Sequence, residues 1–185
     1  GAQVLDLEEL ASHRSSVLGL IPGQPQPSQK HFDTLVWDAL RQFDPRRPVY
    51  VESESRKVGN LSVPEPLMLA IRASPCYALE LSEDERVGLL LEDYDFFVKD
   101  RDFFSQRLQA LTELRGKAVV EKWQSQIAAG QMDVVVRDLL LTHYDPTYAS
   151  SLKRNFTQSG QATPLRADNR SPQAMQALAR QLVSL

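Results

Sequence analysis

The stretch PVYVESESRKVGN, residues 48–60, decides how this sequence is interpreted. Its first four residues are apolar, β-branched or aromatic, which favours a short strand over a helix. The sequence then changes to carboxylates, hydroxyls and cations, and Gly59-Asn60 favours a tight turn with positive φ. The stretch therefore predicts a buried strand whose carboxyl end carries a charged loop.

Further strands and helices alternate with this strand along the chain. Apolar runs predict strands at residues 4–7, 76–81 and 162–165. Serines followed by helical spacing predict helices that begin after Ser28, Ser82 and Ser171. Alternating strands and helices indicate an α/β domain with a parallel sheet. We expect one such domain over residues 1–185, with a helical insertion at about 96–158 that includes a helix ending at Asp145-Pro146.

In parallel sheets, ligands bind beyond the carboxyl ends of the strands. Candidate residues at these ends, and on the loops and helices that follow, are Asp6, Glu8, His13, Arg14, Glu52, Glu54, Arg56, Lys57 and Arg86. Glu52 follows an apolar run, where an acidic side chain can orient a water or a Mg²⁺ ion. The alternative is a carboxylate that only marks the end of the strand.

The cations of the same loop also have two interpretations. Arg56 offers a planar fork suited to phosphate, and Lys57 offers a point charge. A solvated charged loop is the alternative. His13 and Arg14 can meet an anion or sit at the surface, and Arg86 can reach a phosphate or form a surface ion pair. We expect Cys76 to be buried in a strand as part of the core.

The composition limits the possible classes of protein. The chain has 185 residues, with 42% hydrophobic residues, 24% charged residues and a net charge of −3. This balance is typical of a globular domain and does not favour nucleic-acid binding through overall charge. The single cysteine excludes a disulfide framework and fits a reducing, cytoplasmic setting. No apolar run approaches the roughly 20 residues of a membrane helix.

Four segments, taken together, resemble bacterial tRNA 2-selenouridine synthases. They are VLDLE at 4–8 with His13-Arg14, QPSQK at 26–30, ESESRKVGN at 52–60 and HYDP at 143–146. Ser15 departs from the glycine expected after His13-Arg14. The chain also contains no G-x-x-x-x-G-K-[ST] phosphate loop. The resemblance covers the part of a P-loop domain that follows the phosphate loop.

The resemblance implies a cytoplasmic transferase that acts on wobble uridine in tRNA. Such enzymes join a rhodanese-like domain to a P-loop domain and convert 2-thiouridine to 2-selenouridine through S-geranyl-2-thiouridine. Their substrates are tRNA, geranyl diphosphate and selenophosphate. They need no covalent cofactor. Glu52 and Glu54 are the candidate catalytic carboxylates, and Glu52 is also the candidate ligand for Mg²⁺. With the first strand and the phosphate loop absent, we expect the chain alone to be inactive, and marginally stable or prone to aggregation because strand edges are exposed.

Two other functions remain open from the residues. One is a remnant of a P-loop kinase or NTPase that acts on a small molecule. The other is a non-catalytic RNA-binding module. Its basic candidates are Arg46, Arg47, Lys153, Arg154, Arg166 and Arg170.

Overall fold

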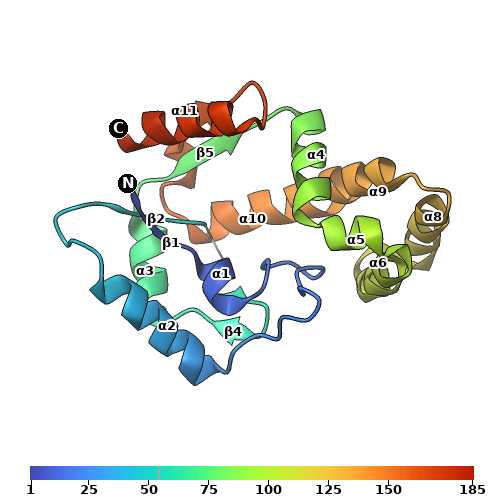
Figure 1. Cartoon of the computed structure of the whole chain (residues 1–185), viewed down its shortest axis with the longest axis horizontal. Helices are drawn as coiled ribbons and strands as arrows, with labels where there is room; N and C mark the ends of the chain where they lie inside the picture. Colours follow the sequence, from blue (N-terminus) through green and yellow to red (C-terminus); the bar gives the residue numbers. More distant parts are fainter. Residues whose placement is uncertain (54) are drawn as a thin grey trace. The chain divides into compact units, whose positions relative to one another are not determined.

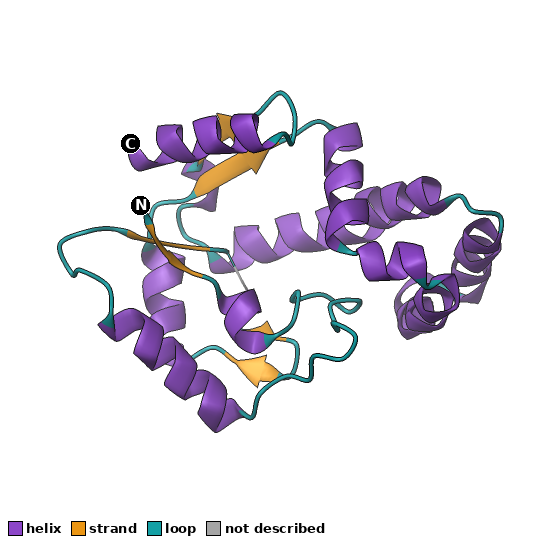
Figure 2. Cartoon of the chain, viewed as in Figure 1, coloured by secondary structure: helices purple, strands orange, loops and turns teal. Residues whose placement is uncertain are grey.

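The computed structural model describes residues 1–53 and 55–185, which divide into two compact units (Figure 1). Unit 1 consists of Gly1–Ser74 with Asn155–Gln158, and unit 2 consists of Pro75–Arg154 with Ser159–Leu185. Each unit contains one parallel pair of strands together with helices (Figure 2). The predicted α/β class is confirmed, and the described strands form three separate two-stranded sheets.

Unit 1 builds its parallel pair from strands that are far apart in the sequence. Its elements are β1 (Gln3–Leu5), α1 (Leu7–Ala11), α2 (Gln29–Arg41), β2 (Val49–Val51), β3 (Lys57–Val58), β4 (Leu61–Ser62) and α3 (Glu65–Ala73). β1 pairs with β2, and β3 forms an antiparallel hairpin with β4. The core includes Leu5, Leu7 and Phe32, which are almost completely buried.

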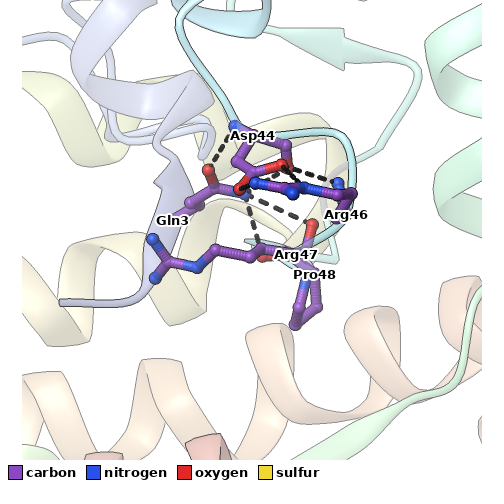
Figure 3. Close-up of polar contacts among 5 residues, drawn as sticks. All are labelled: Gln3, Asp44, Arg46, Arg47 and Pro48. Atoms are coloured by element: carbon purple, nitrogen blue, oxygen red, sulfur yellow. Dashed lines mark hydrogen bonds and ion pairs between the residues drawn. The ribbon is translucent and has the colours of Figure 1, made fainter.

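Gln3 ties the start of β2 to β1. Its side-chain Nε2 donates to the backbone oxygens of Asp44 and Arg47 at 3.2 and 3.3 Å (Figure 3). Its Oε1 accepts from the backbone N–H of Asp44 at 2.6 Å, and Asp44 in turn binds Arg46 (Figure 3). This amide therefore satisfies backbone groups of the turn before β2 and helps to fix the strand that leads to Glu52.

The first strand is shorter than predicted. β1 ends at Leu5, Asp6 caps α1, and Leu7 is the first residue of that helix. Asp6 Oδ1 accepts from the backbone N–H of Glu9 at 2.7 Å, and this capping bond favours a helical turn over a longer strand. Val4 is 58% exposed, so the prediction that this strand is buried is wrong for Val4.

Unit 2 is mainly helical. Its elements are β5 (Tyr77–Glu80), α4 (Glu83–Asp93), α5 (Asp95–Lys99), α6 (Arg101–Leu108), η1 (Gln109–Leu111), α7 (Thr112–Arg115), α8 (Lys117–Ala128), α9 (Met132–Leu139), η2 (Leu140–Tyr144), α10 (Asp145–Asn155), η3 (Ser159–Gln161), β6 (Thr163–Arg166) and α11 (Pro172–Val183). Trp123, Leu108 and Val135 are fully buried where α8 packs against α6 and α9. β5 and β6 form the parallel pair.

The predicted end of a helix at Asp145-Pro146 is wrong. The chain continues through a π-helical turn, η2, directly into α10, whose second residue is Pro146. Proline is tolerated in the first turn of a helix, where the missing N–H costs little. The same dipeptide therefore serves the start of α10.

The second and third strands are more exposed than predicted. Val49 in β2 is exposed, and Tyr50 and Val51 are half-buried. Cys76 precedes β5 and is half-buried, and Leu79 within β5 is 66% exposed. Its partner Leu165 in β6 is fully buried. None of the helices in the described part of the chain combines the length and apolar character that crossing a bilayer requires.

Candidate functional site

Glu52 follows β2 and binds the first turn of α1. Its Oε1 accepts from the backbone N–H of Leu7 at 2.5 Å and from that of Glu8 at 3.1 Å. The first N–H groups of a helix have no partner within the helix, so an acceptor at this place stabilises it. The structure thus brings Glu52 together with Asp6 and Glu8, as predicted for neighbouring strand ends.

The environment of Glu52 changes its acidity. Burial raises the pKa of the Glu52 carboxyl above its usual value, because it disfavours the charged form. The backbone N–H groups that donate to this carboxyl lower the pKa by less, and the charge of Asp6 raises it further. Glu52 is therefore a carboxyl that takes up a proton more readily than an exposed glutamate does.

His13 packs between the loop that follows α1 and the β3–β4 hairpin. A Cβ added to Gly19 would lie 2.9 Å from His13 Cε1, and one added to Gly59 would lie 2.8 Å from His13 Cδ2. Its ring is buried, and its backbone N–H donates to the oxygen of Glu8. His13 therefore connects α1 to the hairpin, and the prediction that it binds an anion remains a prediction.

Arg14 and Ser15 form the turn after His13. The backbone N–H of Arg14 donates to the oxygen of Gly19 at 2.9 Å. Ser15 has a φ of 44°, in the left-handed region that glycine enters without steric cost. The loop thus keeps a glycine-like backbone at the position where the family resemblance leads us to expect glycine.

Two glutamines of the QPSQK segment hold the β3–β4 hairpin, a role that the sequence did not reveal. Gln26 Nε2 donates to the backbone oxygens of Val58 and Ala11, and its Oε1 accepts from the N–H of Asn60 at 2.9 Å. Gln29 exchanges two 2.8 Å hydrogen bonds with the backbone of Ser62. The only signal of this role in the sequence is a pair of glutamines, three residues apart, on either side of a helix start.

The cations Arg56 and Lys57 lie at the start of this hairpin. Both side chains are exposed, and neither makes an ion pair or a hydrogen bond within residues 1–53 and 55–185. Ser55 Oγ donates to the backbone oxygen of Lys57 at 2.6 Å and so helps to fix the backbone that carries them. Glu54, predicted as a catalytic carboxylate, lies outside the described residues.

Arg86 belongs to unit 2, on α4. Its two terminal nitrogens bind the two carboxylate oxygens of Asp145, at 3.1 and 2.5 Å. This bidentate ion pair uses the Arg86 guanidinium, the group that was predicted to bind phosphate. The predicted phosphate contact remains a prediction.

Several basic residues of the RNA-binding alternative also bind carboxylates. Arg46 binds Asp44, Arg166 binds Glu80, and Arg170 binds both Glu85 and Glu92. Among the described residues, no group of three or more His, Cys, Asp or Glu side chains is arranged to hold a metal ion.

The chain is thus an α/β protein. Carboxylates lie at the ends of β1 and β2, and the β3–β4 hairpin beside them carries two exposed cations. A model of the tRNA 2-selenouridine synthase AAA domain matches residues 2–104, more than half of the chain. The chain therefore belongs to this family, as the sequence resemblance predicted.

Curated relatives agree with this assignment. The tRNA 2-selenouridine synthase of Marinobacter nauticus is 29% identical in an alignment of 172 positions that covers 78% of this chain and 47% of the relative. That of Shewanella oneidensis is 29% identical in an alignment of 180 positions that covers 82% of this chain and 48% of the relative. That of Cupriavidus pinatubonensis is 41% identical over 92 residues, 49% of this chain and 25% of the relative. The longer of these matches span about half the length of the relatives, and no solved structure matches the chain.

Proposed function

We propose that this chain is part of an enzyme that converts wobble 2-thiouridine in tRNA to 2-selenouridine through S-geranyl-2-thiouridine. The family assignment and the names of the relatives support action on tRNA. The geranyl diphosphate and selenophosphate steps follow from the sequence resemblance. The proposal assigns the phosphate loop and the rhodanese-like domain to other parts of the full-length protein.

Arg56 and Lys57 have the chemistry to bind the phosphate groups of these substrates. In geranylation, the uridine sulfur forms a bond to the geranyl C1, and the bond from C1 to the diphosphate oxygen breaks. The diphosphate leaves with the bonding electrons, and fixed cations stabilise the charge that develops on it. In selenation, the selenium of selenophosphate forms a bond to C2 of the base, and the C2–S bond breaks as geranyl thiolate leaves. Water then cleaves the selenium–phosphorus bond, which releases phosphate and leaves selenium on C2.

The observation that carries this assignment is that neither cation has a side-chain partner among the described residues. Both are exposed and without a side-chain partner in the part of the chain that the structure describes, whereas Gln26 and Gln29 fix the hairpin that bears them. A positioned cation without a carboxylate is available to an anionic ligand.

The proposal keeps Mg²⁺ as a partner of the phosphates. Mg²⁺ is usually held by one or two carboxylates together with substrate phosphates, so the pair Glu52 and Asp6 suits it. Glu52 is the residue to which we assign the ion, which would offset phosphate charge. Glu52 already accepts two backbone hydrogen bonds, so its position is set before any ion binds.

The test is turnover by the full-length protein with thiolated tRNA, geranyl diphosphate and selenophosphate. Arg56→Ala with Lys57→Ala should lower both geranylation and selenation by about 100-fold or more, the usual cost of losing charge stabilisation in a transition state. The matched control is Arg41→Ala with Arg46→Ala, two exposed arginines of unit 1 that bind Asp38 and Asp44. Wild-type rates for both reactions in the first variant would refute the proposal.

A further inference from the structure

Unit 2 contains a pocket that takes no part in the site described above. It has a volume of about 250 Å³ and lies among α7, α8, α9 and η2. The residues that line it are Arg115, Val119, Lys122, Asp138 and Thr142. Val119 is 37% exposed and Thr142 is exposed, so a ligand can reach the pocket from solvent.

Arg115 is the residue that points to a ligand. Its Nε and one terminal nitrogen are buried, and neither donates a hydrogen bond to any acceptor in the described chain. A guanidinium is always charged, and leaving its buried donors unpaired costs free energy. Arg86 in the same unit shows the usual solution, since both of its terminal nitrogens bind Asp145. Because these two nitrogens are closed off from solvent, the donor that an anionic oxygen in the pocket can reach is the remaining terminal nitrogen of Arg115.

The carboxylate of the pocket is already engaged. Asp138 Oδ2 accepts from the indole Nε1 of Trp123 at 2.8 Å and lies 3.4 Å from Lys122 Nζ. Arg115 and Lys122 carry two positive charges and Asp138 carries one negative charge. The resulting net charge of one positive unit matches a singly charged anion, such as a phosphodiester, better than a diphosphate.

The π-helical turn η2 shapes one wall of the pocket. It carries Thr142, which lines the pocket, and the buried His143. Burial lowers the pKa of His143, and the nearby charge of Arg115 lowers it further. π-helical turns inside helices occur frequently at functional sites. Thr142 adds a hydroxyl that can donate to a phosphate oxygen.

We propose that this pocket binds a backbone phosphate of an RNA strand. The inference rests on the proposed function, which supplies tRNA as the substrate. A volume of about 250 Å³ lies below the roughly 300–1,000 Å³ of typical small-molecule pockets, so it suits one group of a larger ligand. Arginine contacts to phosphates position RNA-binding proteins without reading sequence.

The experiment measures binding of unmodified tRNA by the full-length protein as a function of salt. Arg115→Ala should weaken binding about tenfold and reduce the slope of log K against log salt by about 1, as expected for one lost phosphate contact. Thr142→Val should weaken binding by about threefold, the loss of one modest hydrogen bond. Lys117→Ala, which removes an exposed cation bound to Glu121 outside the pocket lining, is the control and should bind nearly as wild type does.

Thermal unfolding without RNA separates binding from structure. Removing an uncompensated buried charge should leave the melting temperature of Arg115→Ala unchanged or higher. A lower melting temperature together with unchanged tRNA affinity would show that Arg115 is structural and would overturn the inference.

Two further outcomes keep the proposals apart. If the wild-type protein binds no tRNA, the proposed function fails. If the wild type binds tRNA and Arg115→Ala binds it with equal affinity and salt slope, only the pocket assignment fails. Titration with inorganic phosphate tests the other source of the same chemistry, because saturation at micromolar phosphate with no effect on tRNA binding would assign the pocket to the free anion.

Discussion

The two ends of the 52–57 segment differ in how their charged side chains are held. Glu52 is half-buried and accepts hydrogen bonds from two backbone N–H groups of α1. Arg56 and Lys57 are exposed, and their side chains have no partner within the described residues. The acid thus contributes to the structure of unit 1, whereas the cations have no side-chain partner among the described residues that would compete with a ligand.

This difference separates a charged residue that the fold itself uses from charged residues that are candidates for ligand binding. A carboxylate that satisfies the start of a helix is explained by folding alone, even when it stands at a strand end. Exposed cations on a hairpin that two glutamines hold by backbone hydrogen bonds make no side-chain contact within the described fold, so they can bind a ligand without breaking one. We therefore propose the basic end, Arg56 and Lys57, as the first candidate for the ligand-binding role.

The largest effect on stability should come from a substitution at Gly59, in the hairpin that carries Arg56 and Lys57. A Cβ added to Gly59 would lie 2.4 Å from Gln26 Oε1, and the backbone of Gly59 has a φ of +60°. Gly59→Ala should lower the free energy of unfolding by about 3 kcal/mol, through the left-handed backbone and the displaced Gln26 hydrogen bonds. Denaturant unfolding of the full-length protein measures this.

Gly23 is the matched control for Gly59. It also has a positive φ, of 74°, but an added Cβ would meet no atom within 4 Å. Gly23→Ala should therefore cost only about 1 kcal/mol, from the backbone alone. Equal losses in the two variants would show that Gln26 and His13 do not support the hairpin.

A smaller effect should come from the acidic end, as a dependence of stability on pH. Because the pKa of Glu52 is raised in the folded protein, its protonated form is favoured there, and the unfolded chain binds fewer protons. The contribution of Glu52 to the free energy of unfolding is therefore complete below about pH 4, near the pKa of an unfolded glutamate, and is lost as pH rises through the folded pKa.

Glu52→Gln removes this titration and provides the measurement. The free energy of unfolding of the wild type minus that of the variant should decrease as pH rises above about 4. An increase over the same range would mean that the backbone N–H donors outweigh burial and that the folded pKa is lowered.

Local sequence patterns predicted the features that depend on neighbouring residues. The helix caps at Ser28, Ser82 and Ser171 are confirmed, because each serine Oγ accepts from an N–H three residues later. The last strand is confirmed as β6. Proline is tolerated there because, among the described strands, β6 pairs only with β5 and so has one open edge.

Long-range contacts could not be predicted in the same way. The roles of Gln26 and Gln29 depend on a hairpin more than 30 residues away in the sequence. The exposure of Leu79 depends on which side of the sheet other elements cover, and the π-helical turn overrides the helix-stopping signal of Asp145-Pro146. The acidic cluster was predicted because strand ends converge in a parallel pair.

The most direct test of the central claim is the affinity of the full-length protein for geranyl diphosphate, measured by calorimetric titration. If the basic end binds the diphosphate, Arg56→Ala with Lys57→Ala should weaken the affinity by about tenfold or more, which corresponds to about 1.4 kcal/mol. The paired-arginine control, Arg41→Ala with Arg46→Ala, should change it by no more than about twofold, since exposed ion pairs contribute little. Equal affinities for the wild type and the Arg56, Lys57 double variant would contradict the claim.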